Sequence, residues 1–249
     1  HGGSLLMAGT YPTLSTGEVI VYPARRTVAV PTQALKFVNG FRKTWVSGIP
    51  QDAWRTSYKG LTNADKTALW NFFEAQKGAY DTSWTFALDA VNYLKFAFAS
   101  DELMFVETPE QPNRWSCDVA IRQVGSYGSF PSVTATYPLL SSGALTQLPY
   151  RETQQWRTVI RDMPAGQSYR WPQQQTSQTI FPLSYSAISP AEAETLRIFF
   201  LAMRGSHGTF SFTDPNGTVH PAARFDQDQL EIGYLGRNHR SIDEVRILV

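Results

Sequence analysis

The chain has 249 residues, with 22 basic and 21 acidic side chains and a formal net charge of +1. Tight binding of DNA or RNA needs a clear excess of clustered Lys and Arg, so this charge balance argues against a nucleic-acid partner. Aromatic residues make up 13% of the chain and charged residues 17%, less than the roughly 25% of charged residues in typical soluble domains. This composition fits a surface that partners partly cover or, equally, an aromatic-rich β protein.

The start of the chain and its single cysteine bear on where the protein works. Residues 1–7 have the composition of a tag remnant followed by a start at Met7, and we leave them out of the fold argument. No apolar run approaches the roughly 18 residues of a membrane span, so we expect no membrane partner. Because Cys117 is the only cysteine, no intrachain disulfide forms, which favours maturation in a reducing cytoplasm.

The most informative feature is an internal repeat. Residues 10–17 (TYPTLSTG) return as residues 136–143 (TYPLLSSG), 126 positions later, and matches continue to the end of the chain at a shift of 126 or 127. A shift that stays constant over a whole unit indicates a duplication. We therefore predict two domains, at residues 8–125 and 132–249, with a Gly/Ser/Pro linker at residues 126–131.

Each copy is expected to contain a hairpin upstream of its helix. In the first copy, Asn39-Gly40 is a dipeptide typical of tight hairpin turns, and it lies within strand-like residues 35–45. In the second copy, residues 163–166, which end in Gly166, separate two strand-like runs between residues 151 and 169. We expect such extended hairpins to take part in self-association.

The clearest element of each copy is an amphipathic helix, at residues 62–78 and 189–205. A Ser or Thr followed three residues later by Asp or Glu approximates a capping box, and a glycine supplies the left-handed stop. Lys77 and Arg204 precede these glycines and are expected to favour the negative end of the helix. Apolar residues follow the i, i+3, i+4 spacing of a buried helix face: Leu69, Phe72 and Phe73, then Leu196, Phe199 and Phe200.

The remaining segments are predicted to be strands. Alternating apolar residues indicate strands at residues 84–86 and 210–212, and residues 214–217 (DPNG) form a tight turn. The alternation then resumes at residues 225–232 and 245–249. The predicted fold class is mainly β (α+β), with one packed α-helix in each of the two domains.

No pattern typical of catalysis or phosphate binding occurs, so we expect no enzyme and no cofactor. Asp214, Asp226 and Asp228 are weak candidates for a divalent-metal site, because the last two would share one strand face; a simple polar face is the favoured interpretation. Cys117 has no histidine in its copy. The histidines of the second copy are isolated and are not expected to be ligands: His207, His220 and His239.

Subunit contacts are the remaining site hypothesis. Arginines near the start of each copy are candidates for salt bridges between subunits, although exposed arginines contribute little to stability. The two hairpin turns are candidates on account of their predicted projection. The full set of candidate interface residues is Arg25, Arg26, Asn39, Gly40, Arg151, Arg157 and Gly166.

The segments around the second helix resemble minor tail and distal tail proteins of long-tailed phages. The residues that carry the resemblance are 199–205 (FFLAMRG), 209–217 (TFSFTDPNG), 223–225 (ARF) and 228–230 (DQL). The first copy shows the same outline at residues 72–78, 84–86 and 98–103. It departs from the pattern by having residues 88–92 in place of the Asp-containing turn, and by lacking an Arg before Phe98.

This resemblance implies a tail-tube-like fold, a β-sandwich or split barrel flanked by a helix, that assembles sidewise into rings. Such proteins join the tail tube to the hub or baseplate of the virion tail and are assembled in the host cytoplasm. Two domains per chain allow a trimer with pseudo-six-fold symmetry, and a hexamer is the competing arrangement. The expected partners are other copies of this chain, the tail tube, the hub and other tail-tip proteins.

Two other functions stay open on the sequence. The chain is alternatively a tandem β-sandwich that binds a carbohydrate or a protein through exposed Trp and Tyr faces, without catalysis. A hydrolase is the third possibility, but it requires a carboxylate pair in a cleft, and the sequence gives no such pair.

Overall fold

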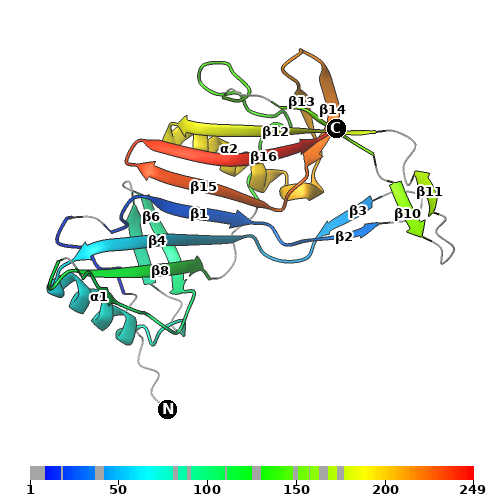
Figure 1. Ribbon diagram of the computed structural model, residues 1–249. Helices are drawn as coiled ribbons and strands as arrows, with labels where there is room; N and C mark the ends of the chain where they lie inside the picture. Colours follow the sequence, from blue (N-terminus) through cyan, green and yellow to red (C-terminus); the bar gives the residue numbers. More distant parts are fainter. Residues whose placement is uncertain are drawn as a thin grey trace. The chain divides into compact units, whose positions relative to one another are not determined.

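The structure is a computed structural model of the chain (Figure 1). It describes residues 9–249 except 18, 37–41, 81–83, 89–90, 110, 125–129, 148–150, 157, 163–167 and 173–176. The chain forms two compact units. Unit 1 consists of His1–Val28, Gln51–Tyr127 and Ile232–His239, and unit 2 of Ala29–Pro50, Gly128–Glu231 and Arg240–Val249.

Unit 1 is an antiparallel sheet with a helix. Its strands are neighbours in the order β1-β4-β8-β6-β5, and β7 pairs with β8. Along β4, Asp52, Trp54, Thr56 and Tyr58 are buried and the residues between them are more exposed, as expected for a strand with one face on the core. Its elements are β1 (Ala24–Ala29, of which Ala29 falls in unit 2), β4 (Gln51–Leu61), α1 (Asn63–Ala75), β5 (Trp84–Leu88), β6 (Val91–Phe98), β7 (Val106–Glu107) and β8 (Trp115–Gln123).

Unit 2 repeats this plan with two additional hairpins. In its main sheet β13, β14 and β16 are neighbours in that order, and β12 pairs with β16 and β9. The hairpins β2–β3 and β10–β11 are separate two-stranded sheets. Its elements are β2 (Thr32–Lys36), β3 (Arg42–Val46), β9 (Thr153–Gln155), β10 (Thr158–Asp162), β11 (Ser168–Pro172), β12 (Gln178–Ile188), α2 (Pro190–Ala202), the short 3-10 helix η1 (Gly205–His207), β13 (Phe210–Thr213), β14 (Val219–Phe225), the first residues of β15 (Gln229–Gly236) and most of β16 (His239–Leu248).

The mainly-β class and both predicted helices are confirmed. Thr62 caps α1 and Ser189 caps α2, each through a complete capping box. Gly78 and Gly205 take the left-handed conformation expected at a helix stop, with φ of +63° and +59°. Among the described residues, no helix has the length and apolar character needed to cross a membrane.

The expected role of Lys77 and Arg204 is corrected. Both lie beyond the last helical turn, so neither sits where it would offset the negative helix end. Both also have positive φ, +54° and +58°, and thus form part of the reversal that follows each helix. Positive φ is uncommon for residues other than glycine.

The aromatic core of unit 1 has a counterpart in unit 2. Tyr11 contacts Phe72 at a ring-centroid distance of 5.5 Å, and Tyr137 contacts Phe199 at 5.6 Å. The hydroxyl oxygens of Tyr11 and Tyr58 lie 3.0 Å apart, and those of Tyr137 and Tyr185 lie 2.9 Å apart. These contacts recur 126 to 127 positions later, in residues that are far from each other in sequence within each copy.

The structural units differ from the predicted domains in two segments. Residues 29–50 of the first sequence copy belong to unit 2, and residues 232–239 of the second copy belong to unit 1. The sequence boundaries followed the repeat, whereas packing assigns each of these segments to the unit formed mainly by the other copy.

The strand expected at residues 225–232 is also corrected. The chain reverses at residues 226–228, so the segment is divided between the end of β14 and the start of β15. Asp226 forms an ion pair with Arg246 at 3.0 Å, and the Asp228 carboxylate accepts the Ser206 amide at 3.0 Å, so polar contacts to β16 and η1 hold this reversal.

Candidate functional site: a hairpin and its docking corner

The aspartates considered as metal ligands do not form a site. Asp214 lies at the turn after β13, where its carboxylate accepts the amides of Asn216 and Thr218, both at 2.9 Å, and His220 Nε2 at 3.2 Å. Although burial opposes it, hydrogen bonds from Thr218, His220 and Asn216 lower the pKa of Asp214. Asp226 and Asp228 serve the next reversal. Within the described residues, no three His, Cys, Asp or Glu side chains gather as a metal site would require.

Cys117 lines a pocket of about 340 Å³ between β8 and the segment before β7. Burial, and then the charge of Asp118, raise the pKa of its thiol to about 12. The thiol is therefore protonated at neutral pH, and a protonated thiol is a poor nucleophile. The pocket does not activate its cysteine.

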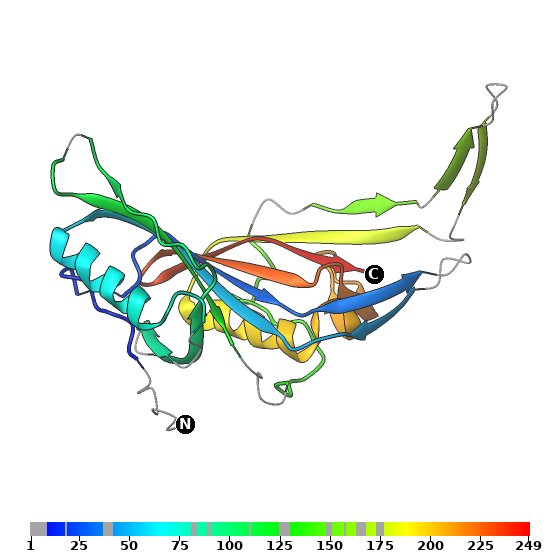
Figure 2. The same ribbon diagram turned by 90° about the horizontal axis from the view of Figure 1, so that it is seen from below.

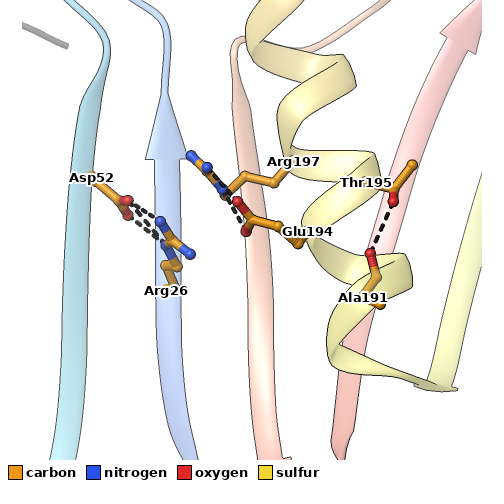
Figure 3. Close-up of polar contacts among 6 residues, drawn as sticks. All are labelled: Arg26, Asp52, Ala191, Glu194, Thr195 and Arg197. Atoms are coloured by element: carbon orange, nitrogen blue, oxygen red, sulfur yellow. Dashed lines mark hydrogen bonds and ion pairs between the residues drawn. The ribbon is translucent and has the colours of Figure 1, made fainter. Parts of the chain in front are cut away.

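Arg26 is not an interface residue, which corrects that expectation. It is 3% exposed, and its Nε donates to both carboxylate oxygens of Asp52 at 2.9 and 3.0 Å, with a further bond from its terminal nitrogen (Figure 3). Its guanidinium also lies 5.1 Å from the ring centre of Trp54. The Arg26 side chain is buried and its ion pair with Asp52 holds β1 to β4 inside unit 1, so it is not accessible to another subunit.

Of the other arginine and turn candidates, Arg25 and Arg151 are exposed. Arg157, Asn39, Gly40 and Gly166 lie outside the described residues. The contacts on α2 that Figure 3 also shows are the bond of Thr195 to the Ala191 carbonyl and the pair of Arg197 with Glu194. Contacts of this kind between neighbours on one helix contribute only a few tenths of a kcal/mol.

The most specific polar arrangement in unit 2 is the docking of the β2–β3 hairpin. The Thr32 hydroxyl donates to the carboxylate of Asp228. His207 Nδ1 lies 2.9 Å from the carbonyl oxygen of Thr44, and the amide of Val30 donates to the Asp228 carbonyl at 2.9 Å. The hairpin is thus held at both of its strands and at its base.

The surface that receives this hairpin is the unit 2 corner, formed by Gly205, Ser206, His207 and Asp228. A Cβ at Gly205 would lie 3.1 Å from Asp228 Oδ1 and 3.4 Å from Val30 Cβ, and the φ of +59° at this position also favours glycine. Val30 is fully buried here, at 0% exposed. Backbone geometry, the half-buried carboxylate of Asp228 and the apolar contact of Val30 together define the docking.

The first copy has an equivalent surface, the unit 1 corner, formed by Gly78, Ala79, Tyr80 and Asp101. Asp101 Oδ1 accepts the Ala79 amide at 2.9 Å, as Asp228 Oδ1 accepts the Ser206 amide at 3.0 Å. A Cβ at Gly78 would lie 3.0 Å from Asp101 Oδ1. Tyr80 replaces His207 and is 74% exposed.

The sequence indicated part of this site. The repeat places Gly78 opposite Gly205 and Asp101 opposite Asp228, but Asp228 was considered only as a weak metal ligand or as part of a polar strand face. The role of Thr32 was missed. The sequence does contain a sign of that role, because the repeat shift of 126 positions places Thr158 opposite Thr32.

No family model matches the chain, and no curated protein is significantly similar to it.

Proposed function

We propose that this chain is a structural protein of a phage or phage-derived tail tip, where it forms a ring or adaptor between the tail tube and the hub or baseplate. It acts by assembly rather than by catalysis. In this proposal it resides in the virion tail, and its partners are further copies of itself, the tube, the hub and neighbouring tail-tip proteins.

The observation that carries the proposal is the assignment of the β2–β3 hairpin to unit 2. A segment of one repeat completes the unit formed mainly by the other, through Thr32, Thr44 and Val30. Repeats that complete one another by exchanging segments are suited to extend the same contact from chain to chain. The second hairpin, β10–β11, is a two-stranded sheet of its own and does not pair with the main sheet of unit 2 (Figures 1 and 2).

The order of elements in unit 2 supports the resemblance to tail proteins. A capped helix, α2, ends at a left-handed glycine, and the aromatic strand β13 follows. The turn at residues 214–217 closes with bonds from Gly217 N to the Asp214 carbonyl and from Asp214 N to the Thr218 carbonyl, both 2.9 Å. Strand β14 then carries the Arg224-Phe225 pair.

The test is the mass of the assembled protein. Sedimentation velocity of the full chain, alone and with tail tube and hub proteins, is expected to give species of three or six times the 27.9 kDa chain mass. Electron microscopy of the same sample is expected to show rings. A chain that stays monomeric even with tail partners present contradicts the proposal.

Exposed aromatics favour the binding module as the second candidate. Trp70, Tyr80 and Trp156 are each large and exposed. Aromatic faces of this kind stack on sugar rings as well as on protein partners. Specific binding of the monomer to a glycan array would support the binding module, and a ring without glycan binding would support the tail role.

A further inference from the structure

We propose that the chain binds a second copy of itself head to tail, with the β10–β11 hairpin of one chain docked on the unit 1 corner of the next. This inference rests on the proposed function, since it names the surface through which copies of the chain associate. The template for the contact is the docking of β2–β3 on the unit 2 corner within one chain.

The two hairpins have the same design. In β2–β3 the paired residues run from Thr32 with Val46 to Lys36 with Arg42. In β10–β11 they run from Thr158 with Pro172 to Asp162 with Ser168. Every bound of the second hairpin lies 126 positions after the first, so Thr158 occupies the place of Thr32.

The two corners also have the same design. Each has a glycine in the left-handed region, followed by an amide bonded to an aspartate Oδ1. In the unit 2 corner the other oxygen of Asp228 accepts the Thr32 hydroxyl. Asp101 is exposed, and within the described residues its Oδ2 accepts no hydrogen bond. It is therefore open to the hydroxyl of Thr158 from another chain.

The groups left uncovered in the second copy match those that are covered in the first. Val30 is 0% exposed at the unit 2 corner, whereas Trp156, 126 positions later, is 58% exposed. Thr32 is half-buried and Thr158 is exposed. A large exposed aromatic beside an exposed hydrogen-bonding group is the composition of an interface hot spot. Docking would bury Trp156 against Gly78 and give Asp101 the donor that Asp228 already has.

Such a contact is heterologous, because a hairpin of one chain meets a corner of another rather than an identical surface. Heterologous contacts repeat head to tail and form a ring when the rotation between chains closes. The contact joins the exposed Thr158 of one chain to the exposed Asp101 of the next. The geometry therefore leads to a ring and not to a two-fold dimer.

Cysteine cross-linking tests the contact. Thr44 and His207 touch within the chain, and the positions that correspond to them are Arg170 and Tyr80, both exposed. The full-length double variant Tyr80→Cys/Arg170→Cys is treated with a short bismaleimide and run on a denaturing gel. Cys117 does not compete, because it is buried. We expect covalent species at successive multiples of 27.9 kDa.

Two controls fix the interpretation. The matched variant Thr44→Cys/His207→Cys is expected to link within one chain and to keep the single-chain mass. A mixture of the two single variants, Tyr80→Cys and Arg170→Cys, is expected to give a two-chain product and nothing larger, because each chain then carries one reactive position of the pair.

A second variant keeps the test independent of the cross-linker. Trp156→Ser is expected to weaken self-association at least tenfold in sedimentation, as truncation of a buried interface Trp does. Leu139→Ser, at a residue that is equally exposed at 58%, is expected to leave the association constant within about twofold.

The outcomes separate the two proposals. Oligomers that form normally, without a link between positions 80 and 170 and without an effect of Trp156→Ser, overturn the docking contact and leave the tail-tip function standing. A chain that sediments as a monomer at every concentration, with and without tail partners, and forms no link between chains overturns both.

Discussion

The hairpins β2–β3 and β10–β11 have the same strand lengths and the same pairing, and they differ in their surroundings. The first is bonded to the unit 2 corner through Thr32 and Thr44. The second exposes Thr158, Ile160 and Tyr169. The two hairpins therefore differ in what they contact and not in their strand pairing.

The units differ in their cores as well. Arg26 and Asp52 form a buried ion pair in unit 1, and the corresponding position to Arg26 in the second copy is Glu152, so the pair is not repeated. The two corners are therefore equivalent although the buried cores of the two units differ. This separation makes the two units suitable internal controls for each other.

The largest effect is expected from the helix cores. Phe200 is fully buried and contacts Phe225 at 5.1 Å, whereas its counterpart Phe73 is only half-buried and contacts Phe98 at 4.9 Å. Phe200→Ala is expected to lower the free energy of unfolding by about 3–5 kcal/mol, and Phe73→Ala by less. Urea unfolding followed by tryptophan fluorescence measures both, and equal losses would contradict the difference in packing between the units.

The corner aspartates come next. Asp228→Ala removes acceptors from Thr32 and from the buried Ser206 amide, so it is expected to cost about 2–3 kcal/mol. Asp101→Ala removes the acceptor of Ala79 at an exposed site and is expected to cost less in the monomer. Hydrogen exchange should show faster exchange in β2–β3 only for Asp228→Ala. Unchanged exchange there would show that the hairpin is not held by this carboxylate.

The sequence predicted the parts of this fold that depend on local chemistry. Thr62, Asp65, Ser189 and Glu192 identified both helix starts, because a capping box needs only four consecutive residues. It did not predict that residues 29–50 would pack with the second copy. An internal repeat identifies equivalent segments, but it does not show which copy each segment packs against. The reversal at Asp226 and Asp228 was missed for a related reason: alternation alone does not distinguish one strand from two that are joined by polar turn residues.

Acid is expected to weaken both units in the same pH window. Although burial opposes it, hydrogen bonds from Thr62 and Ser15 lower the pKa of Asp65 to about 2, and bonds from Ser141 and then Ser189 lower that of Glu192 to about 2. A depressed pKa gives stability that is complete above about pH 4.5 and is lost as the pH falls towards 2. Each carboxyl contributes on the order of 1–2 kcal/mol after solvent screening.

Thermal melting between pH 6 and pH 2.5 measures this loss. Glu192→Gln should flatten the pH dependence of unit 2 and leave that of unit 1, since Gln carries no titrating group. If Glu192→Gln leaves the pH profile unchanged, protonation of Glu192 does not cause the loss of stability in acid.

The smallest effect is expected at the cap hydroxyls. Thr62→Ala and Ser189→Ala each remove one bond to a helix amide, and each is expected to cost about 1 kcal/mol. The losses should be similar, because the two caps have the same bonds. Chemical denaturation at neutral pH is the measurement, and a much larger loss for one cap would show that the local design of the two copies has diverged there.

A cryo-electron microscopy map of the assembled protein tests the central claim most directly. The account predicts a closed ring in which β10–β11 of each chain lies on Gly78 and Asp101 of the next, with Trp156 buried between them. A ring in which β10–β11 stays in solvent, or is seated on another surface, would contradict it.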